Sequence, residues 1–202
     1  PAPRTSPGCQ QCPGGPPRRR TPAPSPPPPV WAATSTRPAH VWIGGDSLAG
    51  ELDWGLTPLL DDAGAFTTTA FYKGSSGICR YDYFDWSRKL KSVMATVRPD
   101  AVVFTVGAND TQSVWTADGW IHYGTARWRK AYGRRVGELM DIMLDRGARR
   151  VYWVGMPIMA ERWRDSRMRT IDKLFAAEAE ARPGVMHIDI RALFADADGR
   201  YV

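Results

Sequence analysis

The stretch AVVFTVGAND, residues 101–110, decides the fold class. Its first six residues are apolar or β-branched, as in a strand buried on both faces, and a Gly-Ala-Asn-Asp turn follows at once. Two other stretches have the same form, VWIGGDS at residues 41–47 and VYWVGMP at residues 151–157. Short apolar strands that break directly into loops are typical of parallel sheets covered on both faces.

Helical periodicity separates these strands from one another. Two further strands are expected at residues 65–72 and 185–190. Apolar side chains recur at helical spacing from Leu48 to Leu60, Leu90 to Val97, Trp128 to Leu144 and Met168 to Phe175. This alternation predicts an α/β fold, a three-layer α/β/α sandwich with a five-stranded parallel sheet in the flavodoxin-like strand order 2-1-3-4-5. Such sheets bind ligands at the carboxyl ends of their strands.

The composition divides the 202 residues into two parts. Residues 1–40 hold 13 of the 17 prolines, five arginines and no acidic residue. We therefore predict a disordered Pro/Arg-rich linker over residues 1–38 and one folded domain over residues 39–202. The formal charge of +6 arises almost entirely from the first part, which argues against a basic nucleic-acid-binding face on the domain.

Three cysteines are too few for a disulfide framework. Cys9 and Cys12 form a C-x-x-C pair that could be a redox pair or half a zinc site, but no strand or helix pattern surrounds it. A chance spacing in a flexible segment is the other interpretation. Cys79 is interpreted as structural.

Three polar loops are expected at one edge of the sheet, because each follows a parallel strand. Ser47 stands between a strand and a helix, where its hydroxyl is exposed or caps the helix; Asp46 is an alternative cap. Asn109 follows the next strand of the sheet, and Gly77 closes the loop after the strand at residues 65–72. An amide side chain and backbone N–H groups that converge on one point are suited to stabilising an oxyanion.

These residues resemble the sequence blocks of the SGNH/GDSL hydrolase superfamily. GDSL at residues 45–48 is similar to the first block, the glycine of SSG at residues 75–77 to the second, and GAND at residues 107–110 to the G-x-N-D third block. The resemblance runs over residues 40–202. SSG, FDW at residues 84–86 and VGMP at residues 154–157 resemble an actinobacterial branch of exported, wall-associated proteins.

The resemblance implies a serine esterase or O-acyltransferase that acts on acyl esters of cell-wall carbohydrate or lipid, without metal or cofactor. Ser47 would be the nucleophile, Gly77 and Asn109 would bind the oxyanion, and Asp46 would support them. Five further residues near these loops are candidates for substrate binding: Tyr81, Trp86, Asp110, Trp115 and His122. We expect an extracytoplasmic monomer, tethered to membrane or wall through its N-terminal segment, with no nucleic-acid partner.

One block of the superfamily is missing from this sequence. The general base is a histidine in a D-x-x-H block after the fifth strand, and residues 191–202 contain none. His122 and His187, the latter two residues before Asp189, are weaker candidates for a base, and His40 precedes the first strand. We expect residues beyond Val202 to carry the Asp and His. The alternative is a non-catalytic glycan-binding or scaffolding domain with the same fold.

Overall fold

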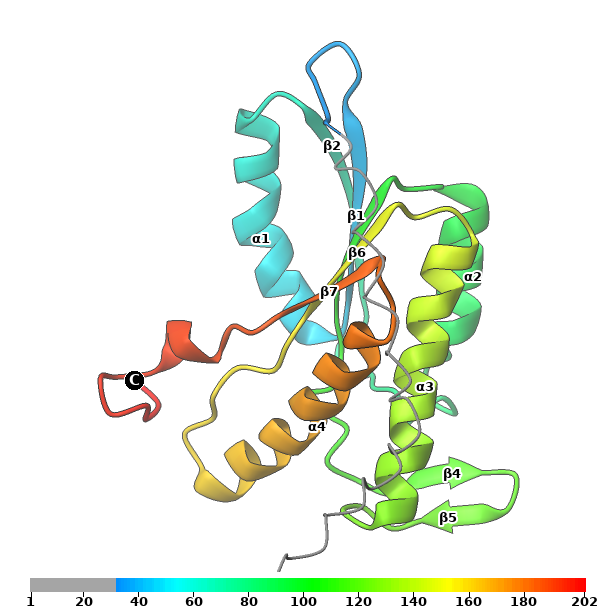
Figure 1. The fold of residues 1–202 in the computed structure, drawn as a ribbon, viewed down its shortest axis with the longest axis vertical. Helices are drawn as coiled ribbons and strands as arrows, with labels where there is room; N and C mark the ends of the chain where they lie inside the picture. Colours follow the sequence, from blue (N-terminus) through cyan, green and yellow to red (C-terminus); the bar gives the residue numbers. More distant parts are fainter. Residues whose placement is uncertain (1–31) are drawn as a thin grey trace, which may run out of the picture.

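A computed structural model describes residues 32–202 as a twisted parallel sheet with helices on both faces (Figure 1). The strands of this sheet are β1 (Ala39–Gly45), β2 (Phe66–Tyr72), β3 (Ala101–Thr105), β6 (Arg150–Val154) and β7 (Val185–Ile188). Their spatial order is β2-β1-β3-β6-β7 and every pairing is parallel. The predicted fold class and strand order are confirmed.

The helices divide unequally between the two faces of the sheet. α1 (Ser47–Asp62) lies alone on one face, whereas α2 (Trp86–Thr96), α3 (Ala126–Asp145) and α4 (Arg162–Glu180) cover the other (Figure 1). Successive side chains along a strand point to opposite faces of the sheet, so one strand provides apolar residues to both faces. Val41 and Ile43 pack toward α1, while Trp42 packs into the core under the three helices.

Large aromatic side chains fill the core beneath the three helices. The ring of Phe104 on β3 is 5.1 Å from that of Trp153 on β6 and 5.2 Å from that of Trp86 on α2. Phe175 of α4 packs on Trp153 at 5.2 Å. Edge-to-face rings at these separations bury much apolar surface and fix how the helices dock.

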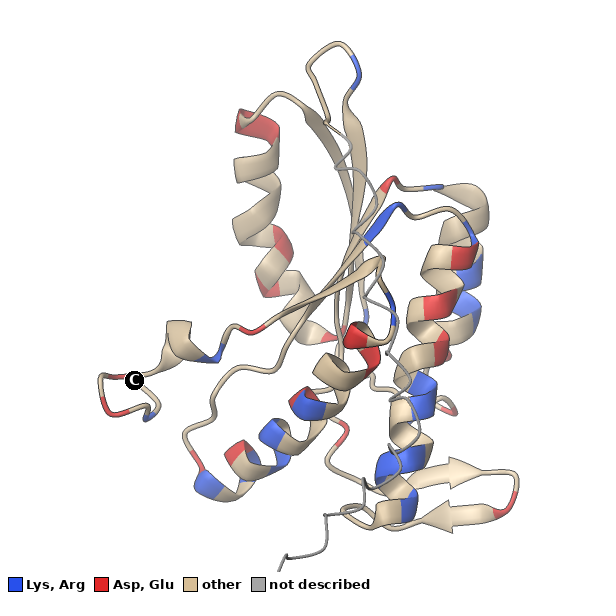
Figure 2. Cartoon of the chain, viewed as in Figure 1, with Lys and Arg blue, Asp and Glu red and all other residues tan. Residues whose placement is uncertain are grey.

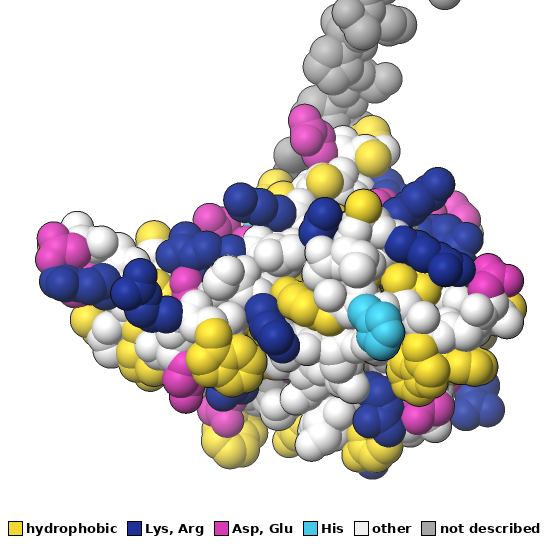
Figure 3. Space-filling view, turned by 90° about the horizontal axis from the view of Figure 1, so that it is seen from below, with side chains coloured by type: hydrophobic (Ala, Val, Ile, Leu, Met, Phe, Trp, Pro, Cys, Tyr) yellow, Lys and Arg dark blue, Asp and Glu magenta, His cyan; other side chains and the backbone are white. Residues whose placement is uncertain are grey.

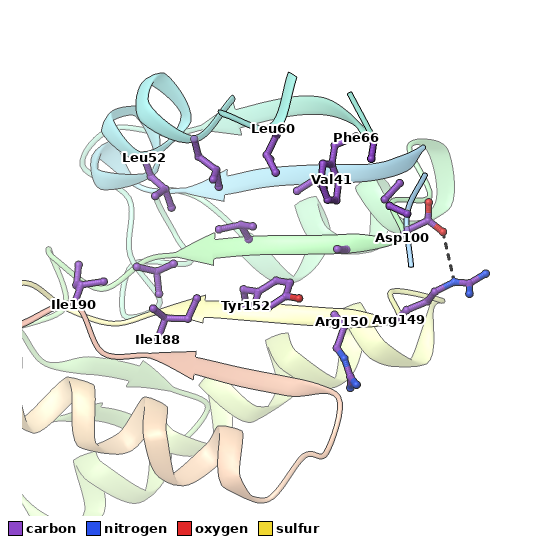
Figure 4. A pocket seen from close by; sticks show the side chains of 17 residues that line it. Val41, Leu52, Leu60, Phe66, Asp100, Arg149, Arg150, Tyr152, Ile188 and Ile190 are labelled. Carbon is purple, nitrogen blue, oxygen red and sulfur yellow. Dashed lines mark ion pairs between the residues drawn. The ribbon is translucent and has the colours of Figure 1, made fainter. Parts of the chain in front are cut away.

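The face that carries α1 is only partly covered. Between α1 and the far edge of the sheet lies a hollow of about 840 Å³, into which Val41, Leu52, Tyr152 and Ile188 project (Figure 4). Most of its wall is apolar, and an ion pair between Asp100 and Arg149 at 3.5 Å stands at one end. The hollow contains none of the three polar loops.

Several elements differ from the sequence-based expectation. The structure contains a hairpin of β4 (Val114–Thr116) and β5 (Gly119–Ile121) that the sequence analysis does not predict. Strands of three residues are too short to show the alternation of polar and apolar residues. The Asp-Gly pair at the turn is the signal that could have indicated it. A 3-10 turn, Arg191–Phe194, follows β7. α4 begins six residues before the predicted start, since its first turns are rich in arginine and lack an apolar stripe.

β1 begins at Ala39, and residues just before it form a turn in which Thr34 and Arg37 exchange backbone hydrogen bonds. Most of the predicted linker, with Cys9 and Cys12, lies outside the described residues. Cys79 is buried and unpaired, consistent with a structural role. Within residues 32–202, no helix combines the length and apolar character needed to cross a bilayer.

Candidate active site

The three polar loops meet at the carboxyl ends of β1, β2 and β3, at the lower edge of the sheet in Figure 1. The strand register brings this about, because Gly45 pairs with Tyr72 on one side and with Thr105 on the other. Figure 3 views the molecule from this side, where basic side chains are spread among hydrophobic and acidic ones.

Asp46 joins the first loop to the third. It is fully buried and caps α1, with Oδ1 accepting a hydrogen bond from the backbone N–H of Leu48 at 3.0 Å. Oδ2 accepts from the N–H groups of Gly107 at 3.0 Å and Ala108 at 3.1 Å. Burial raises the pKa of this carboxyl to about 6, although the three backbone hydrogen bonds oppose the rise. One side chain therefore fixes the start of α1 against the loop that carries Asn109.

Ser47 is the first residue of α1, and its side chain is exposed. Because Asp46 is the helix cap, the Ser47 hydroxyl is not used for capping, and it makes no hydrogen bond to any residue in the range 32–202. The turn before it requires glycine. Gly45 has a φ of +146°, and a Cβ there would lie 1.6 Å from the backbone oxygen of Thr105.

Asn109 joins the third loop to the second. Its Nδ2 donates a hydrogen bond to the backbone oxygen of Ser76 at 2.9 Å. An amide nitrogen carries two hydrogens, so one donor remains beyond this bond. The next residue, Gly77, has no room for a side chain, since a Cβ would lie 2.2 Å from Oδ1 of Asp110. The sheet thus brings the loops of Ser47, Gly77 and Asn109 together through Asp46 and Asn109.

Asp110, predicted to bind substrate, lies inside the protein and is bonded to neighbouring protein groups. Its carboxylate is fully buried and accepts hydrogen bonds from the N–H groups of Ile78 and Cys79 and from the Tyr132 hydroxyl, each at 2.8 Å. Burial raises the pKa of Asp110. Its oxygens support the backbone that follows Gly77. Tyr132 was predicted only as part of an apolar helix face, and sequence periodicity gives no signal for its hydroxyl bond.

Trp86, also predicted to bind substrate, is almost wholly buried and lies at the wall of a hollow of about 250 Å³ beside Gly77. Its side chain is 2% exposed, and its indole Nε1 donates to Oγ of Ser76 at 3.1 Å. The ring therefore supports the second loop from beneath. By contrast, Tyr81 and Trp115 are 42% and 40% exposed and His122 is exposed, so all three are accessible to ligands.

The three histidines are hydrogen-bonded away from Ser47. Nε2 of His40 lies 2.9 Å from Oγ1 of Thr69, toward the amino ends of the strands. His187 does not pair with Asp189; its Nε2 lies 3.0 Å from Oδ1 of Asp172 on α4. Nδ1 of His122 lies 3.4 Å from the hydroxyl of Ser113. Within residues 32–202, no histidine is hydrogen-bonded to Ser47.

The chemistry available at this edge is that of a hydroxyl surrounded by hydrogen-bond donors. Residues 32–202 hold no group of three or more His, Cys, Asp or Glu side chains arranged to bind a metal ion. An exposed serine hydroxyl, a free amide hydrogen and backbone N–H groups at a helix start suit attack on a carbonyl and stabilisation of the resulting oxyanion.

The comparisons with known proteins agree with this architecture. Residues 40–202 match the family described as "Protein of unknown function (DUF459)". No curated protein sequence matches the chain. Several solved structures have the same fold at low sequence identity, so they bear on the fold alone.

Three of these structures illustrate the similarity. LAE5, an alpha/beta hydrolase from the metagenome of Lake Arreo, has a TM-score of 0.56 at 14% identity, over 81% of this chain and 87% of its own. A lipolytic G-D-S-L family protein from Veillonella parvula has a TM-score of 0.55 at 13% identity, over 76% and 78%. The acetylxylan esterase Axe2 from Geobacillus stearothermophilus, a catalytic mutant, has a TM-score of 0.50 at 12% identity, over 81% and 87%.

Proposed function

We propose that the chain is a serine esterase or O-acyltransferase. The premise is that it belongs to the DUF459 family and has the fold of GDSL-type hydrolases. The substrates would be acyl esters of cell-wall carbohydrate or lipid. The observation that carries this proposal is the exposed hydroxyl of Ser47 at the start of α1, beside two loops that Asp46 and Asn109 hold together.

In the proposed reaction, Ser47 Oγ attacks the ester carbonyl carbon and loses its proton to a general base. The carbonyl oxygen becomes an oxyanion, which accepts hydrogen bonds from the N–H groups of Ser47 and Gly77 and from the Asn109 amide; each such donor is typically worth about 3–4 kcal/mol. The C–O bond then breaks, and the base returns its proton to the leaving alcohol. Water or a sugar hydroxyl attacks the acyl-enzyme in the same way.

The general base is the part of this proposal that depends on the resemblance. His40 and His187 are hydrogen-bonded within the sheet and to α4, so neither suits the role. We propose that the base belongs to an Asp-x-x-His segment that follows Val202, as the superfamily pattern implies.

The proposed localisation also depends on the resemblance. We propose that the protein acts outside the cytoplasm, as a monomer tethered through its Pro-rich N-terminal segment.

The test is covalent labelling of Ser47 by a fluorophosphonate, followed by hydrolysis of p-nitrophenyl acetate. The 202-residue chain is compared with a chain that continues through the downstream codons. We expect the longer chain to be labelled and active, and Ser47→Ala to abolish both. Ser92→Ala, which removes an exposed serine on α2, is the matched control and should leave both unchanged. Labelling that survives Ser47→Ala would eliminate this proposal.

A non-catalytic glycan-binding domain is the second candidate, favoured by the absence of a histidine hydrogen-bonded to Ser47 within residues 32–202. It predicts no labelling in either chain but retained affinity for glycans. The same experiment therefore separates the two functions.

A further inference from the structure

Positive charge is concentrated in two segments that lie near the candidate active site. Residues 126–135 of α3 contain five Arg or Lys and no acidic residue, and residues 162–169 of α4 contain four arginines and one aspartate. Both segments are the amino-terminal parts of their helices, at the same edge of the sheet as Ser47 (Figure 2). Residues 41–202 as a whole are nearly neutral, so this concentration is local.

Five of these cations have no carboxylate within ion-pair distance in the described part of the chain: Arg129, Lys130, Arg135, Arg162 and Arg167. Arg129 and Arg162 also lie in the first turns of their helices, where a cation opposes the macrodipole at a cost of roughly 0.3–1 kcal/mol. An anion bound from outside the protein would offset this local excess of positive charge.

Arg167 is held in place by groups that leave its charge uncompensated. Its Nη1 donates to the backbone oxygen of Thr111 at 3.1 Å, two residues after Asn109. Its guanidinium lies 4.9 Å from the ring of Tyr123 and 5.2 Å from that of Trp163. Rings and a carbonyl oxygen orient the side chain, and Trp163 is 59% exposed. The guanidinium therefore lies in a fixed position beside the loop of the proposed oxyanion amide.

Arg135 has the same arrangement beside the second loop. Its Nη1 donates to the backbone oxygen of Ile78 at 3.3 Å, and Nη2 donates to that of Trp115. Its guanidinium lies 4.9 Å from the ring of Tyr81. Arg135, Tyr81 and Gly77 share the wall of a hollow of about 250 Å³. Two oriented arginines, each with an exposed aromatic ring, thus stand next to the two loops that meet at Ser47.

We propose that the ester cleaved or transferred at Ser47 is carried by an anionic glycan. Arg135 and Arg167 would bind its negative groups, and the exposed rings of Tyr81, Trp115 and Trp163 would stack on its sugars. Guanidinium groups bind carboxylate and phosphate through paired, charge-assisted hydrogen bonds. This inference names the substrate class of the proposed function and rests on it.

A glycan fits this surface better than a nucleic acid because acidic side chains are dispersed among the cations. Asp118 lies 3.9 Å from Arg127, Glu138 lies 3.6 Å from Arg134, and Asp165 lies 2.9 Å from Arg169. A duplex, with one charge about every 1.7 Å of its axis, would bring phosphates against these carboxylates. A glycan with more widely spaced charges can contact the unpaired arginines and avoid the carboxylates.

Binding to a purified anionic glycan, measured by calorimetry, tests the inference without turnover. The probes are polygalacturonate, neutral dextran and a DNA duplex, each added to the 202-residue chain. We expect polygalacturonate to bind and dextran to bind at least about tenfold more weakly, which is ~1.4 kcal/mol. Ser47→Ala should leave binding unchanged. Glycan binding that persists while Ser47 of the longer chain is not labelled would refute the proposed function and leave the glycan site standing.

The variants locate the binding site. Arg167→Ala should weaken polygalacturonate binding about tenfold, because a charge-assisted pair is lost, and Arg167→Lys should weaken it less. The matched control is Arg146→Ala at the opposite end of α3, which removes an exposed arginine that also lacks an ion pair in the described structure and should have no effect. Because Arg162 is exposed and unpaired there, Arg162→Ala tests the same surface without endangering folding.

Three results would overturn the inference. Equal losses of polygalacturonate affinity in the Arg167 and Arg146 variants would mean that binding depends on net charge alone, including the charge of the five arginines in residues 1–40. Dextran binding as tight as that of polygalacturonate would remove the anionic requirement. Tighter binding of the DNA duplex, with the same dependence on Arg167 and Arg162, would identify a nucleic-acid surface instead.

Discussion

Replacing Asp46 with Asn tests whether one buried carboxylate holds the candidate site together. The structure gives this side chain three backbone donors, at 3.0, 3.0 and 3.1 Å, on its two oxygens. Asn offers only one oxygen, so either Leu48 or the pair Gly107 and Ala108 would face an NH₂ group instead of an acceptor. Loss of these hydrogen bonds should cost about 1–3 kcal/mol of unfolding free energy.

A second effect depends on pH and adds to the stability of the wild type at low pH. The pKa of Asp46 is raised from 3.8 to about 6, so its proton binds more tightly in the folded state than in the unfolded state. The wild-type protein is therefore most stabilised by this group below about pH 4, and that stability is lost as pH rises through about 6. The full shift corresponds to ~3 kcal/mol, of which about 2 kcal/mol falls between about pH 4.5 and about pH 8.

Urea unfolding of both proteins at these two pH values measures the effect. The difference in unfolding free energy between the wild type and Asp46→Asn should shrink by about 2 kcal/mol from the lower to the higher pH. Asp62→Asn, at the exposed end of the same helix, controls for a change of charge on α1 and should show no such difference. A wild-type advantage that is the same at both pH values would refute the reasoning, since a buried and hydrogen-bonded Asp46 must titrate differently in the two states.

Three further outcomes are expected. Asn109→Ala should lower kcat for a p-nitrophenyl ester by about 10²–10³ with little change in KM, and an equal change in both parameters would contradict an oxyanion role. Tyr132→Phe removes the hydroxyl bonded to Asp110 and should cost about 1–3 kcal/mol in urea unfolding; an unchanged midpoint would show that the bond contributes nothing. Gly45→Ala should prevent folding, because its Cβ would lie 1.6 Å from the backbone oxygen of Thr105. Gly55→Ala, in open space on α1, should instead raise the unfolding free energy by up to ~1 kcal/mol. Circular dichroism distinguishes the two variants, and a well-folded Gly45→Ala would contradict the turn described here.

Sequence patterns predicted the sheet because its strands are short apolar runs followed directly by loops, as in residues 101–110. The loops of Ser47, Gly77 and Asn109 could be placed at one edge for the same reason, since parallel strands end on the same side. The patterns gave no information on which polar side chains point inward. Asp110 and Trp86 follow the loops in sequence, yet both turn into the core, where bonds to distant groups hold them.

Contacts between distant residues account for the rest of what the sequence could not predict. The Asp172–His187 pair joins α4 to β7 across 15 positions, and Asp110 meets Tyr132 across 22. Neither pair has a periodic signature, because each consists of single polar groups on otherwise apolar faces. The β4–β5 hairpin escaped prediction for a different reason: its pairing involves only three residues on each side.

The uneven covering of the sheet has a consequence for the helix that begins with Ser47. The buried residues of α1 are Ala49 and Gly50, both in its first turn, while Leu52 and Leu56 farther along border the open hollow. Anchorage is thus strongest at the end that carries the hydroxyl and declines toward Asp62. The distal turns can fray or shift without displacing the nucleophile. Among the amides that bond within the helix, from Glu51 onward, exchange should therefore be slower near the start of α1 than toward Asp62.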